Sequence, residues 1–203
     1  MPTLDEYKSQ ARLEMENGDY RNAIRSLSEA IAIEGDNVTL YLTRGLAYFM
    51  RKDYNLAIED LTAALAVEHQ NLDALLTRAH AYFHQDALDD AFQDYSEYIN
   101  IVGDVPTAPY ERRAIILTRL GKIQPAIEDY TKTIKHADDK NKGQHYLSRA
   151  ILYYSLGDYE ATVADTSSAI EYNFPAPEVY SARGSAYAQL EQWGDALQNY
   201  DKA

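Results

Sequence analysis

Apolar and small residues recur along this chain with a period close to 34 residues. An arginine followed by a small residue marks five of the periods, at Arg44-Gly45, Arg78-Ala79, Arg113-Ala114, Arg149-Ala150 and Arg183-Gly184. The steps between these marks are 34, 35, 36 and 34 residues, and a further step of 34 back from Gly45 reaches Ala11. The chain therefore contains six copies of one pattern, and a fixed period of this length is the signature of a repeat protein.

Each copy has the pattern of two helices joined by a short turn. In the first helix, an aromatic residue or Leu usually lies four positions before the small residue and another large residue three positions after it, so the three share one helical face. These triplets are Tyr7/Ala11/Glu14, Tyr41/Gly45/Tyr48, Leu75/Ala79/Tyr82, Tyr110/Ala114/Leu117, Tyr146/Ala150/Tyr153 and Tyr180/Gly184/Tyr187. The second helix carries a small, a bulky and another small residue, as in Ala23/Leu27/Ala30, Ala57/Leu61/Ala64 and Ala196/Tyr200/Ala203.

The pattern predicts twelve helices in six antiparallel pairs and no strand. The first helices are expected at about 4–16, 38–50, 72–84, 107–119, 143–155 and 177–189, with an error of roughly two to four residues at each end. Gly18, Gly121 and Gly157 follow three of them and suit a left-handed helix end. The extra residues of the longer copies fall in "GDVPTAP" and "DDKNKGQ", which we interpret as loops.

The first helix of copy two carries two apolar stripes, whereas an ordinary surface helix has one. Tyr41, Gly45 and Tyr48 form the first stripe, and Leu42, Leu46 and Phe49 form the second. The positions equivalent to the second stripe hold Leu76, His80 and Phe83 in copy three, Glu111, Ile115 and Thr118 in copy four, and Leu147, Ile151 and Tyr154 in copy five. In copies one and six they hold Lys8, Arg12, Met15, Ser181, Ser185 and Ala188, so this stripe is apolar in the middle of the chain and polar at both ends.

These motifs resemble the tetratricopeptide repeat (TPR), a 34-residue helix–turn–helix unit with a lead aromatic, Leu-Gly, Tyr, then Ala, Phe, Ala and a final Pro. The resemblance covers the chain from about residue 4 to residue 203. Arg stands in place of the Leu in five copies, and the final Pro is missing. Copy five has Thr162 and Thr166 where a small and a bulky residue belong, so we expect its second helix to pack least well.

The resemblance implies an all-α fold, a TPR-type α-solenoid of antiparallel helix pairs that form a right-handed superhelical arc. One hairpin cannot bury its apolar face alone, so we expect a single solenoid domain over residues 1–203. Its repeats are expected at about 4–37, 38–71, 72–105, 107–140, 143–176 and 177–203.

The resemblance also implies that the first helices line a concave groove. The predicted peptide-binding groove consists of Leu42, Leu46, Phe49, Leu76, His80, Phe83, Ile115, Leu147, Ile151 and Tyr154. An exposed apolar stripe usually marks a partner site, and a peptide or amphipathic helix of a partner protein would fit it. The function predicted is therefore a non-catalytic protein-interaction scaffold or adaptor. The competing interpretation of the stripe is contact with the chain's own tail or wide core packing.

A second function class is a structural segment of a longer or self-assembling solenoid. Copy six has no following helix, so Trp193, Leu197 and Tyr200 are expected to have an uncovered side, and a homo-oligomer through this repeat would cover them. Ser9, Thr43, Thr77 and Ser148 precede the Arg position in four copies. Their hydroxyls could hold a peptide backbone, but bonding to the carbonyls of their own helix is the favoured interpretation.

The amino-acid composition limits which classes of molecule the chain is expected to bind. The net charge is −13 and there is no Lys/Arg cluster, so nucleic acid is an unfavourable partner. Cysteine is absent, which excludes disulfides and thiolate metal sites. No apolar run approaches the roughly 18 residues of a membrane span, and "MPTLDEYKSQ" lacks the pattern of a signal peptide. We therefore expect a protein partner, no membrane association and a cytoplasmic location.

Few residues of the sequence suggest a metal site or a catalytic site. His80 and His84 have the i, i+4 spacing of a metal site, but no third ligand lies nearby in the sequence, so we expect no metal. No nucleophile with its base, glycine-rich phosphate loop or paired-carboxylate motif is present, so we expect no enzyme activity and no cofactor. The clamp by which some TPR proteins hold chaperone tails is also not expected, because Lys8 alone matches its five positions.

A constant offset links the repeat arginines to acidic residues. Asp60, Asp94, Asp129, Asp165 and Asn199 each follow an Arg of the repeat by sixteen residues, whereas copy one has Gln10 and Ser26. Because the offset is unchanged where loops differ in length, we predict pairs within repeats: Arg44–Asp60, Arg78–Asp94, Arg113–Asp129 and Arg149–Asp165. The rival arrangement pairs each Asp with the Arg of the next copy.

Overall fold

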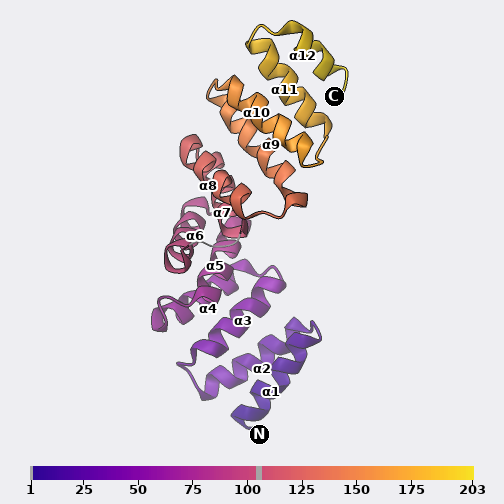
Figure 1. Ribbon diagram of the computed structural model, residues 1–203. Coiled ribbons are helices and arrows are strands. Elements are labelled where there is room, and N and C mark those ends of the chain that lie inside the picture. Colours follow the sequence, from indigo (N-terminus) through magenta and orange to yellow (C-terminus); the bar gives the residue numbers. More distant parts are fainter. Residues whose placement is uncertain (1, 104–106) are drawn as a thin grey trace. The chain divides into compact units, whose positions relative to one another are not determined.

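A computed structural model describes residues 2–103 and 107–203, and this part of the chain is built of α-helices without a strand (Figure 1). The first six helices are α1 (Leu4–Glu16), α2 (Tyr20–Ile33), α3 (Val38–Met50), α4 (Tyr54–Val67), α5 (Leu72–His84) and α6 (Leu88–Val102). The next six are α7 (Thr107–Arg119), α8 (Ile123–His136), α9 (Asp139–Ser155), α10 (Tyr159–Glu171), α11 (Pro177–Gln189) and α12 (Trp193–Tyr200). None of them is long and apolar enough to cross a membrane.

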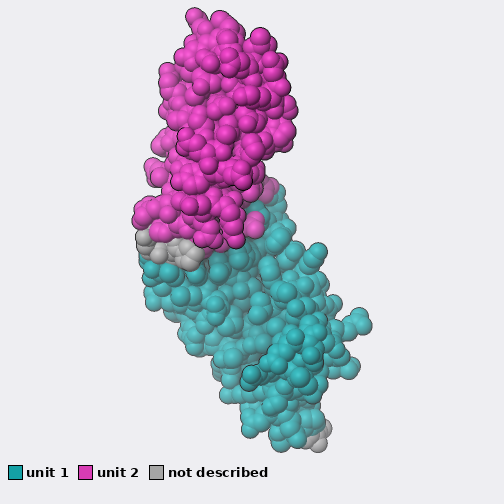
Figure 2. Space-filling model, turned by 45° about the vertical axis from the view of Figure 1, so that its right-hand side comes forward, with its two compact units in different colours: residues 1–103 teal, residues 104–203 magenta. Residues whose placement is uncertain are grey.

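The helices belong to two compact units, Met1–Gly103 and Asp104–Ala203, which Figure 2 shows in different colours. In each unit the two helices of every repeat pack against each other, and second helices also pack on the first helix of the next repeat, as α2 does on α3 and α10 on α11. The twelve expected helices are thus found in the described residues, in six pairs. The expected end of the third repeat, at residue 105, lies outside them, and one solenoid over the whole chain stays a prediction.

The start of α9 corrects one expectation. "DDKNKGQ" was interpreted as a loop with a helix from about residue 143, but α9 begins at Asp139. Asp138 has an extended backbone at the N-cap, and Lys142 Nζ lies 2.8 Å from Asp139 Oδ1, so acidic and basic residues suit an added first turn. Gly143 then lies within a helix.

The turns inside the repeats end the first helices with one left-handed residue. Gly18, Gly121 and Gly157 have φ values of 72°, 71° and 78°, as predicted. The same place is taken by a residue with a side chain in the other repeats, namely Lys52, Asp86 and Glu191, with φ between 59° and 66°. The turn geometry is therefore common to all six repeats and does not depend on glycine.

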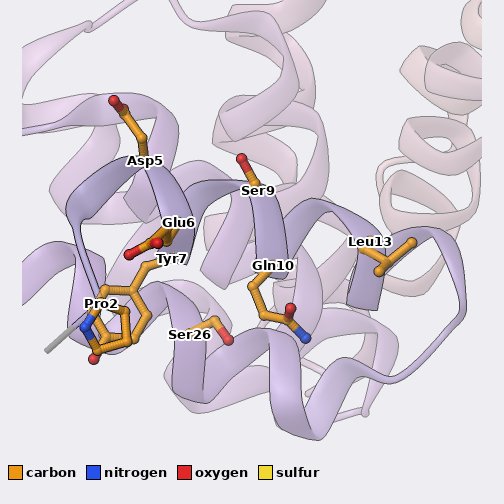
Figure 3. Close-up of a pocket in the computed structure, with 8 residues that line it drawn as sticks. All are labelled: Pro2, Asp5, Glu6, Tyr7, Ser9, Gln10, Leu13 and Ser26. Carbon is orange, nitrogen blue, oxygen red and sulfur yellow. The ribbon is translucent and has the colours of Figure 1, made fainter.

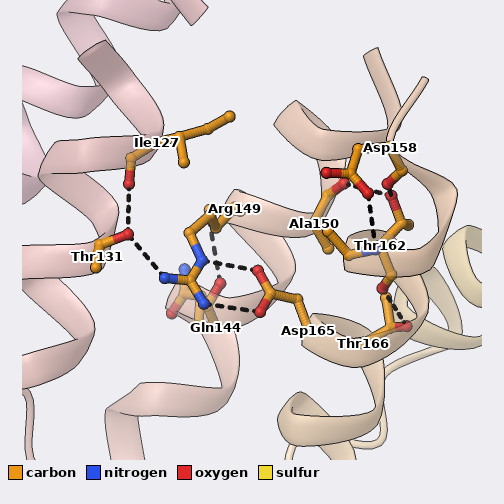
Figure 4. A network of polar contacts seen from close by, with 11 residues as sticks. Ile127, Thr131, Gln144, Arg149, Ala150, Asp158, Thr162, Asp165 and Thr166 are labelled. Atoms are coloured by element: carbon orange, nitrogen blue, oxygen red, sulfur yellow. Dashed lines mark hydrogen bonds and ion pairs between the residues drawn. The ribbon is translucent and has the colours of Figure 1, made fainter. Parts of the chain in front are cut away.

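The core is built from the small residues of the repeat pattern. Ala11, Ala79, Ala114 and Ala150 are at most 1% exposed. At Gly45, an added Cβ would lie 2.9 Å from Leu61 Cγ, which shows how closely α3 and α4 approach. Thr162 and Thr166 are fully buried, and their hydroxyls donate to the helix carbonyls of Asp158 and Thr162, each within 2.8 Å. The polar second helix of copy five is thus satisfied internally (Figure 4).

A third buried row on the first helices was not recognised in the sequence. It lies at the positions of Leu40 and Ala47 in copy two, which are 3% and 0% exposed. Its other buried members are Ala74, Ala81, Pro109, Ile116, His145, Leu152, Val179 and Ala186. In copy one the same positions hold Glu6 and Leu13, and Leu13 is 53% exposed. We call this row the stacking row, because a preceding second helix packs against α3, α5, α9 and α11, where the row is buried.

The predicted Arg–Asp pairs are confirmed in all four repeats. Each Arg donates through Nε and Nη2 to the two carboxylate oxygens of the Asp sixteen residues later, at 2.7–2.8 Å. The rival pairing of Asp60 with Arg78 is therefore wrong. The hydrogen bond to Asp60 raises the pKa of Arg44 above its ordinary value against the effect of burial. In copy six the neutral Asn199 takes the place of the Asp and accepts from Arg183 Nε at 2.8 Å.

The third nitrogen of the guanidinium joins adjacent repeats. Arg44 Nη1 donates to Ser28 Oγ at 3.0 Å, and Arg149 Nη1 donates to Thr131 Oγ1 at 2.8 Å (Figure 4). Thr62 and Ser167 accept in the same way from Arg78 and Arg183. Each acceptor is a hydroxyl on the preceding second helix, two residues after the Asp or Ser position of that repeat. These arginines hold repeat to repeat and are not directed to a ligand.

Several of the 18 tyrosines of the chain lie against these arginines. Arg149 lies between Tyr146 and Tyr153, with its Cζ 5.6 and 5.7 Å from the two ring centroids. Arg44 is flanked in the same way by Tyr41 and Tyr48. A guanidinium attracts the faces of aromatic rings at this distance, so the large residues on either side of the small core residue also cover the buried ion pair.

Candidate peptide-binding surface

The predicted groove residues lie on the first helices, about a third of a turn round the helix from the buried small residues, and two of them are clearly exposed. In the first unit, Leu46 of α3 is 39% exposed, whereas Gly45 and Ala47 beside it are buried. In the second unit, Ile151 of α9 is 54% exposed, between the buried Ala150 and Leu152. The remaining predicted groove residues are partly buried: Leu42, Phe49, Leu76, His80, Phe83, Ile115, Leu147 and Tyr154.

In the first unit, partly buried residues of the predicted groove also contribute to the hydrophobic core. Leu42 and Phe49 pack against the core cluster that contains Leu61 and Leu75. Wide core packing, the competing interpretation of the second stripe, therefore accounts for part of these side chains. What remains open to a partner in this unit is the Leu46 side chain with the outer faces of its neighbours.

An aromatic cluster continues this surface from α3 to α5. The Phe49 ring lies 6.2 Å from His80 and 6.0 Å from His84, and the His84 ring stacks on Tyr54 at 5.0 Å and 2°. His80 also meets the Tyr95 ring edge at 5.6 Å. Both imidazoles are thus placed against aromatic rings. Among the residues that the structure describes, no three His, Asp or Glu side chains are grouped to hold a metal ion.

In the second unit the clearly exposed member of the predicted groove, Ile151, lies on α9. Ile151 is accompanied by Leu147 and Tyr154, and the Tyr154 ring meets Tyr159 edge-on at 5.3 Å. Helices α9 and α11 are in contact, and the equivalent residues of α11 are Ser181, Ser185 and Ala188. The apolar part of the predicted groove in this unit is therefore narrow and centred on Ile151.

The hydroxyls beside the groove positions bond to their own helices. Thr43 Oγ1 donates to the Thr39 carbonyl at 2.7 Å, and Ser148 Oγ donates to the Gln144 carbonyl at 3.2 Å. The interpretation favoured from the sequence is confirmed for these two residues. Their oxygens retain lone pairs that can accept from a ligand, but their single protons are already used.

Two hollows lie near the amino-terminal repeats. One, of about 460 Å³, is lined by groove-side residues of α1 and α3, including Lys8, Arg12, Met15 and Thr43. Lys8 is already paired with Glu34, at 2.7 Å between Nζ and Oε2. The other, of about 850 Å³, is lined by residues of α1, among them Leu13, and by Ser26 of α2 (Figure 3). It occupies the stacking row of copy one and is separate from the predicted groove positions.

Glu111, at the first groove position of copy four, lies beside a buried histidine that was not singled out in the sequence. Glu111 Oε1 is 3.7 Å from Nδ1 of His145, a stacking-row residue that is 7% exposed. Nδ1 has no hydrogen-bond partner among the described atoms. Burial lowers the pKa of His145 below its ordinary value, and the Glu111 carboxylate opposes this. The equivalent positions of copies two and six hold the apolar residues Leu40 and Val179. The repeat pattern therefore did not indicate that a polar residue is buried at position 145.

Acidification is expected to destabilise the fold through His145. Because the folded-state pKa is lowered, the unfolded chain takes up this proton more readily, so stability is full above about pH 6.5 and falls as pH is lowered below it, by up to about 1.4 kcal/mol per pH unit. Urea unfolding across this pH range measures the effect. His145→Leu, which copies the Leu of copy two, should lose this part of the pH dependence, and an unchanged dependence in the variant would contradict the assignment.

Two family models match the chain over its amino-terminal half. The tetratricopeptide repeat model covers residues 42–109, and the TPR repeat model covers residues 11–51. Together with twelve helices in six pairs, these matches decide the family. The chain is a TPR protein. No curated protein sequence matches it.

Solved structures share the fold of this TPR protein at low sequence identity. The crystal structure of MamA protein has 18% identity over 83% of this chain and 90% of its own, with a TM-score of 0.74. YrrB, described as a TPR protein with an unusual peptide-binding site, has 14% identity over 87% and 89%, with a TM-score of 0.76. The C-terminal part of a TPR repeat-containing protein from Cytophaga hutchinsonii has 17% identity over 97% and 77%, with a TM-score of 0.78. Sequence identities of 14–18% show that these proteins share the fold.

Proposed function

We propose that this TPR protein is a non-catalytic interaction scaffold that binds an apolar peptide or amphipathic helix of a partner through its first helices. The observation that carries the proposal is the exposure of Leu46 and Ile151 at equivalent positions of two repeats, each between buried neighbours. Aliphatic side chains at a repeated position outside the core are costly to leave in water and favour a partner site.

The similarity to known folds supports the same class of function. YrrB is described as having a peptide-binding site. In this chain, first helices such as α3 and α5 are in contact, so a bound peptide could touch side chains of more than one repeat. The aromatic cluster of Phe49, Tyr54 and His84 adds large flat surfaces, and its Phe49 follows Leu46 by three residues on α3. The ligand that this surface fits best is a peptide with spaced aliphatic or aromatic anchors.

A peptide selected from a random displayed library against the whole chain provides the test. We expect Leu46→Asp or Ile151→Asp to weaken binding of the selected peptides by about tenfold or more, because a charge would replace an apolar contact. Val67→Asp is the matched control, because Val67 is 57% exposed on the second helix α4. Equal binding to all three variants, or loss with Val67→Asp alone, would show that the groove is not the binding surface.

The alternative is a structural segment that assembles through its last repeat. It is favoured by the side chains of Trp193, Leu197 and Tyr200, which are 67%, 64% and 47% exposed on α12. Sedimentation of the chain at two concentrations separates the two functions. A mass that rises with concentration and returns to the monomer value in Leu197→Asp would favour self-assembly, whereas a monomer at both concentrations would exclude it.

A further inference from the structure

Two polar residues that depart from the repeat pattern meet in the second unit. Glu111 of α7 stands at a position of the second stripe where copies two, three and five have Leu, and His145 of α9 stands in the stacking row. Glu111 Oε1 lies 3.7 Å from His145 Nδ1, so the two side chains join the first helices of adjacent repeats. The two departures form one feature, which we call the Glu–His pair.

The two members of the Glu–His pair differ in exposure. The His145 side chain is 9% exposed, and the Glu111 side chain is 34% exposed. Nδ1 of His145 is buried without a hydrogen-bond partner among the described atoms, and 3.7 Å is too long for a hydrogen bond to the carboxylate. Buried polar atoms are nearly always satisfied, so the carboxylate lies next to a buried nitrogen to which it is not bonded.

The Glu111 carboxylate is open to a cation from outside the chain. Among the described residues it is within ion-pair distance of the His145 imidazole and of no lysine or arginine. Glu111 precedes Ile115 by four residues on α7, so the two side chains share one face of the helix. A carboxylate accepts charge-assisted hydrogen bonds from a guanidinium or ammonium group. The ligand that suits this place therefore has a basic side chain next to an apolar one.

Glu111 is also the charged group that acts on His145. Helix α9 packs on α8, α10 and α11. Asp129 of α8 and Asp165 of α10 are each held by the arginine of their own repeat, and the arginine of α11 bonds within its repeat. Burial lowers the pKa of His145, and the charge that opposes this is that of Glu111. Burial and, to a smaller extent, the same charge raise the pKa of Tyr130 on α8.

We propose that Glu111 binds a lysine or arginine of the partner peptide in the groove, and that protonation of His145 weakens this contact. The proposal rests on the proposed function, because it names a charged contact of the same groove and its regulation. While the imidazole is neutral, the carboxylate keeps its charge for the partner's cation. Once His145 is protonated, an approach of about 1 Å brings Nδ1 to the roughly 2.8 Å of a charge-assisted hydrogen bond to Glu111. The imidazolium then neutralises the carboxylate and repels the partner's cation.

Binding should therefore be strongest at neutral pH and weaken on acidification. Because burial lowers the pKa of His145 below its ordinary value of about 6.5, the imidazole is neutral at pH 7.5, roughly one unit higher. Coupling between two sites is reciprocal, so a bound cation should in turn make His145 harder to protonate.

Peptides selected at pH 7.5 from a random displayed library are the probe, restricted to those that bind the whole chain and lose binding to Ile151→Asp. We expect them to carry a Lys or Arg, and Glu111→Gln to weaken their binding by about two- to fivefold, the range of a partly exposed ion pair. Glu128→Gln is the matched control, because Glu128 is exposed on the second helix α8. Peptides whose basic residue is changed to Gln should bind the unchanged chain and Glu111→Gln equally.

NMR of the histidine side chains in the whole chain tests the regulation without peptide. The signal of His145 is the one that His145→Leu lacks. We expect Glu111→Gln to move its titration to lower pH, because the carboxylate favours the protonated imidazole. Over the pH range of this titration, the affinity for the selected peptides should fall about two- to fivefold, and His145→Leu should abolish the fall.

The outcomes separate this contact from the groove itself. Peptides that depend on Ile151 but lack a basic residue, or bind Glu111→Gln as tightly as the unchanged chain, would overturn the proposal and leave the groove standing. So would a His145 titration that Glu111→Gln does not move, or a fall of affinity with pH that persists in His145→Leu. If no selected peptide depends on Ile151, the groove is wrong and this contact is wrong with it.

Discussion

Replacing Arg149 by Met is expected to lower the free energy of unfolding by about 3–5 kcal/mol, because it leaves the charge of Asp165 buried without its partner. The Asp165 side chain is 8% exposed and both of its oxygens accept from Arg149 at 2.8 Å. The variant also loses the hydrogen bond to Thr131 and the contacts of the guanidinium with the rings of Tyr146 and Tyr153. Urea unfolding followed by circular dichroism measures the difference.

The chain contains its own control for this effect. Arg183 makes the equivalent bonds, but its acceptor is the neutral Asn199. Arg183→Met therefore leaves no buried charge, and we expect it to cost about 1 kcal/mol, the order of ordinary hydrogen bonds. If the two variants lose the same stability, packing and not the uncompensated carboxylate dominates. A double variant, Arg149→Met with Asp165→Leu, should recover much of the loss.

Gly143→Ala is expected to destabilise the second unit by about 3 kcal/mol, because overpacking a closed site forces backbone or side chains to move. A Cβ on Gly143 would overlap the Cβ of Phe174 and would lie 3.1 Å from the Ala169 carbonyl oxygen. Both neighbouring atoms belong to fixed parts of their residues and cannot rotate away. The loss is measured by thermal or urea unfolding.

Gly194→Ala is the matched control, since Gly194 is also helical and an added Cβ there meets nothing within 4 Å. Helix propensity alone should then raise stability by up to about 1 kcal/mol. The two substitutions are chemically identical, so opposite signs would assign the Gly143 effect to the contact with Phe174. A neutral Gly143→Ala would mean that the segment after α10 moves away easily.

The sequence predicted the helices well because the period repeats six times and averages out local noise. Five of the six first helices have the expected bounds. The exception is α9, which begins four residues earlier than expected. Its first turn is stabilised locally by the Asp139–Lys142 ion pair after the N-cap Asp138, whereas the polar composition of this segment is typical of a loop. The Arg–Asp pairs could also be predicted, since a constant offset within a hairpin survives changes in the connecting loops.

The stacking row and His145 could not be predicted from the same pattern. Its members range from Ala and Val to Leu and His, so no shared residue type marks the position. Burial there is decided by a neighbouring repeat and not by the helix itself, as the exposed Leu13 of copy one shows. For the same reason the sequence indicated which groove residues are apolar but not how far core packing covers each.

The arginine links have a consequence for how the length of such a chain can change. Donor and acceptor are 16 residues apart in three of the described links and 18 in the link from Arg149 to Thr131. The longer spacing coincides with the added turn of α9, so an insertion in this connection leaves the bond intact. Duplication of one whole period between two of these helices likewise keeps a hydroxyl acceptor in front of each arginine of the four links. Gain of a whole repeat is thus compatible with these hydrogen bonds, whereas loss of half a period would remove the donor or the acceptor of the link at that point.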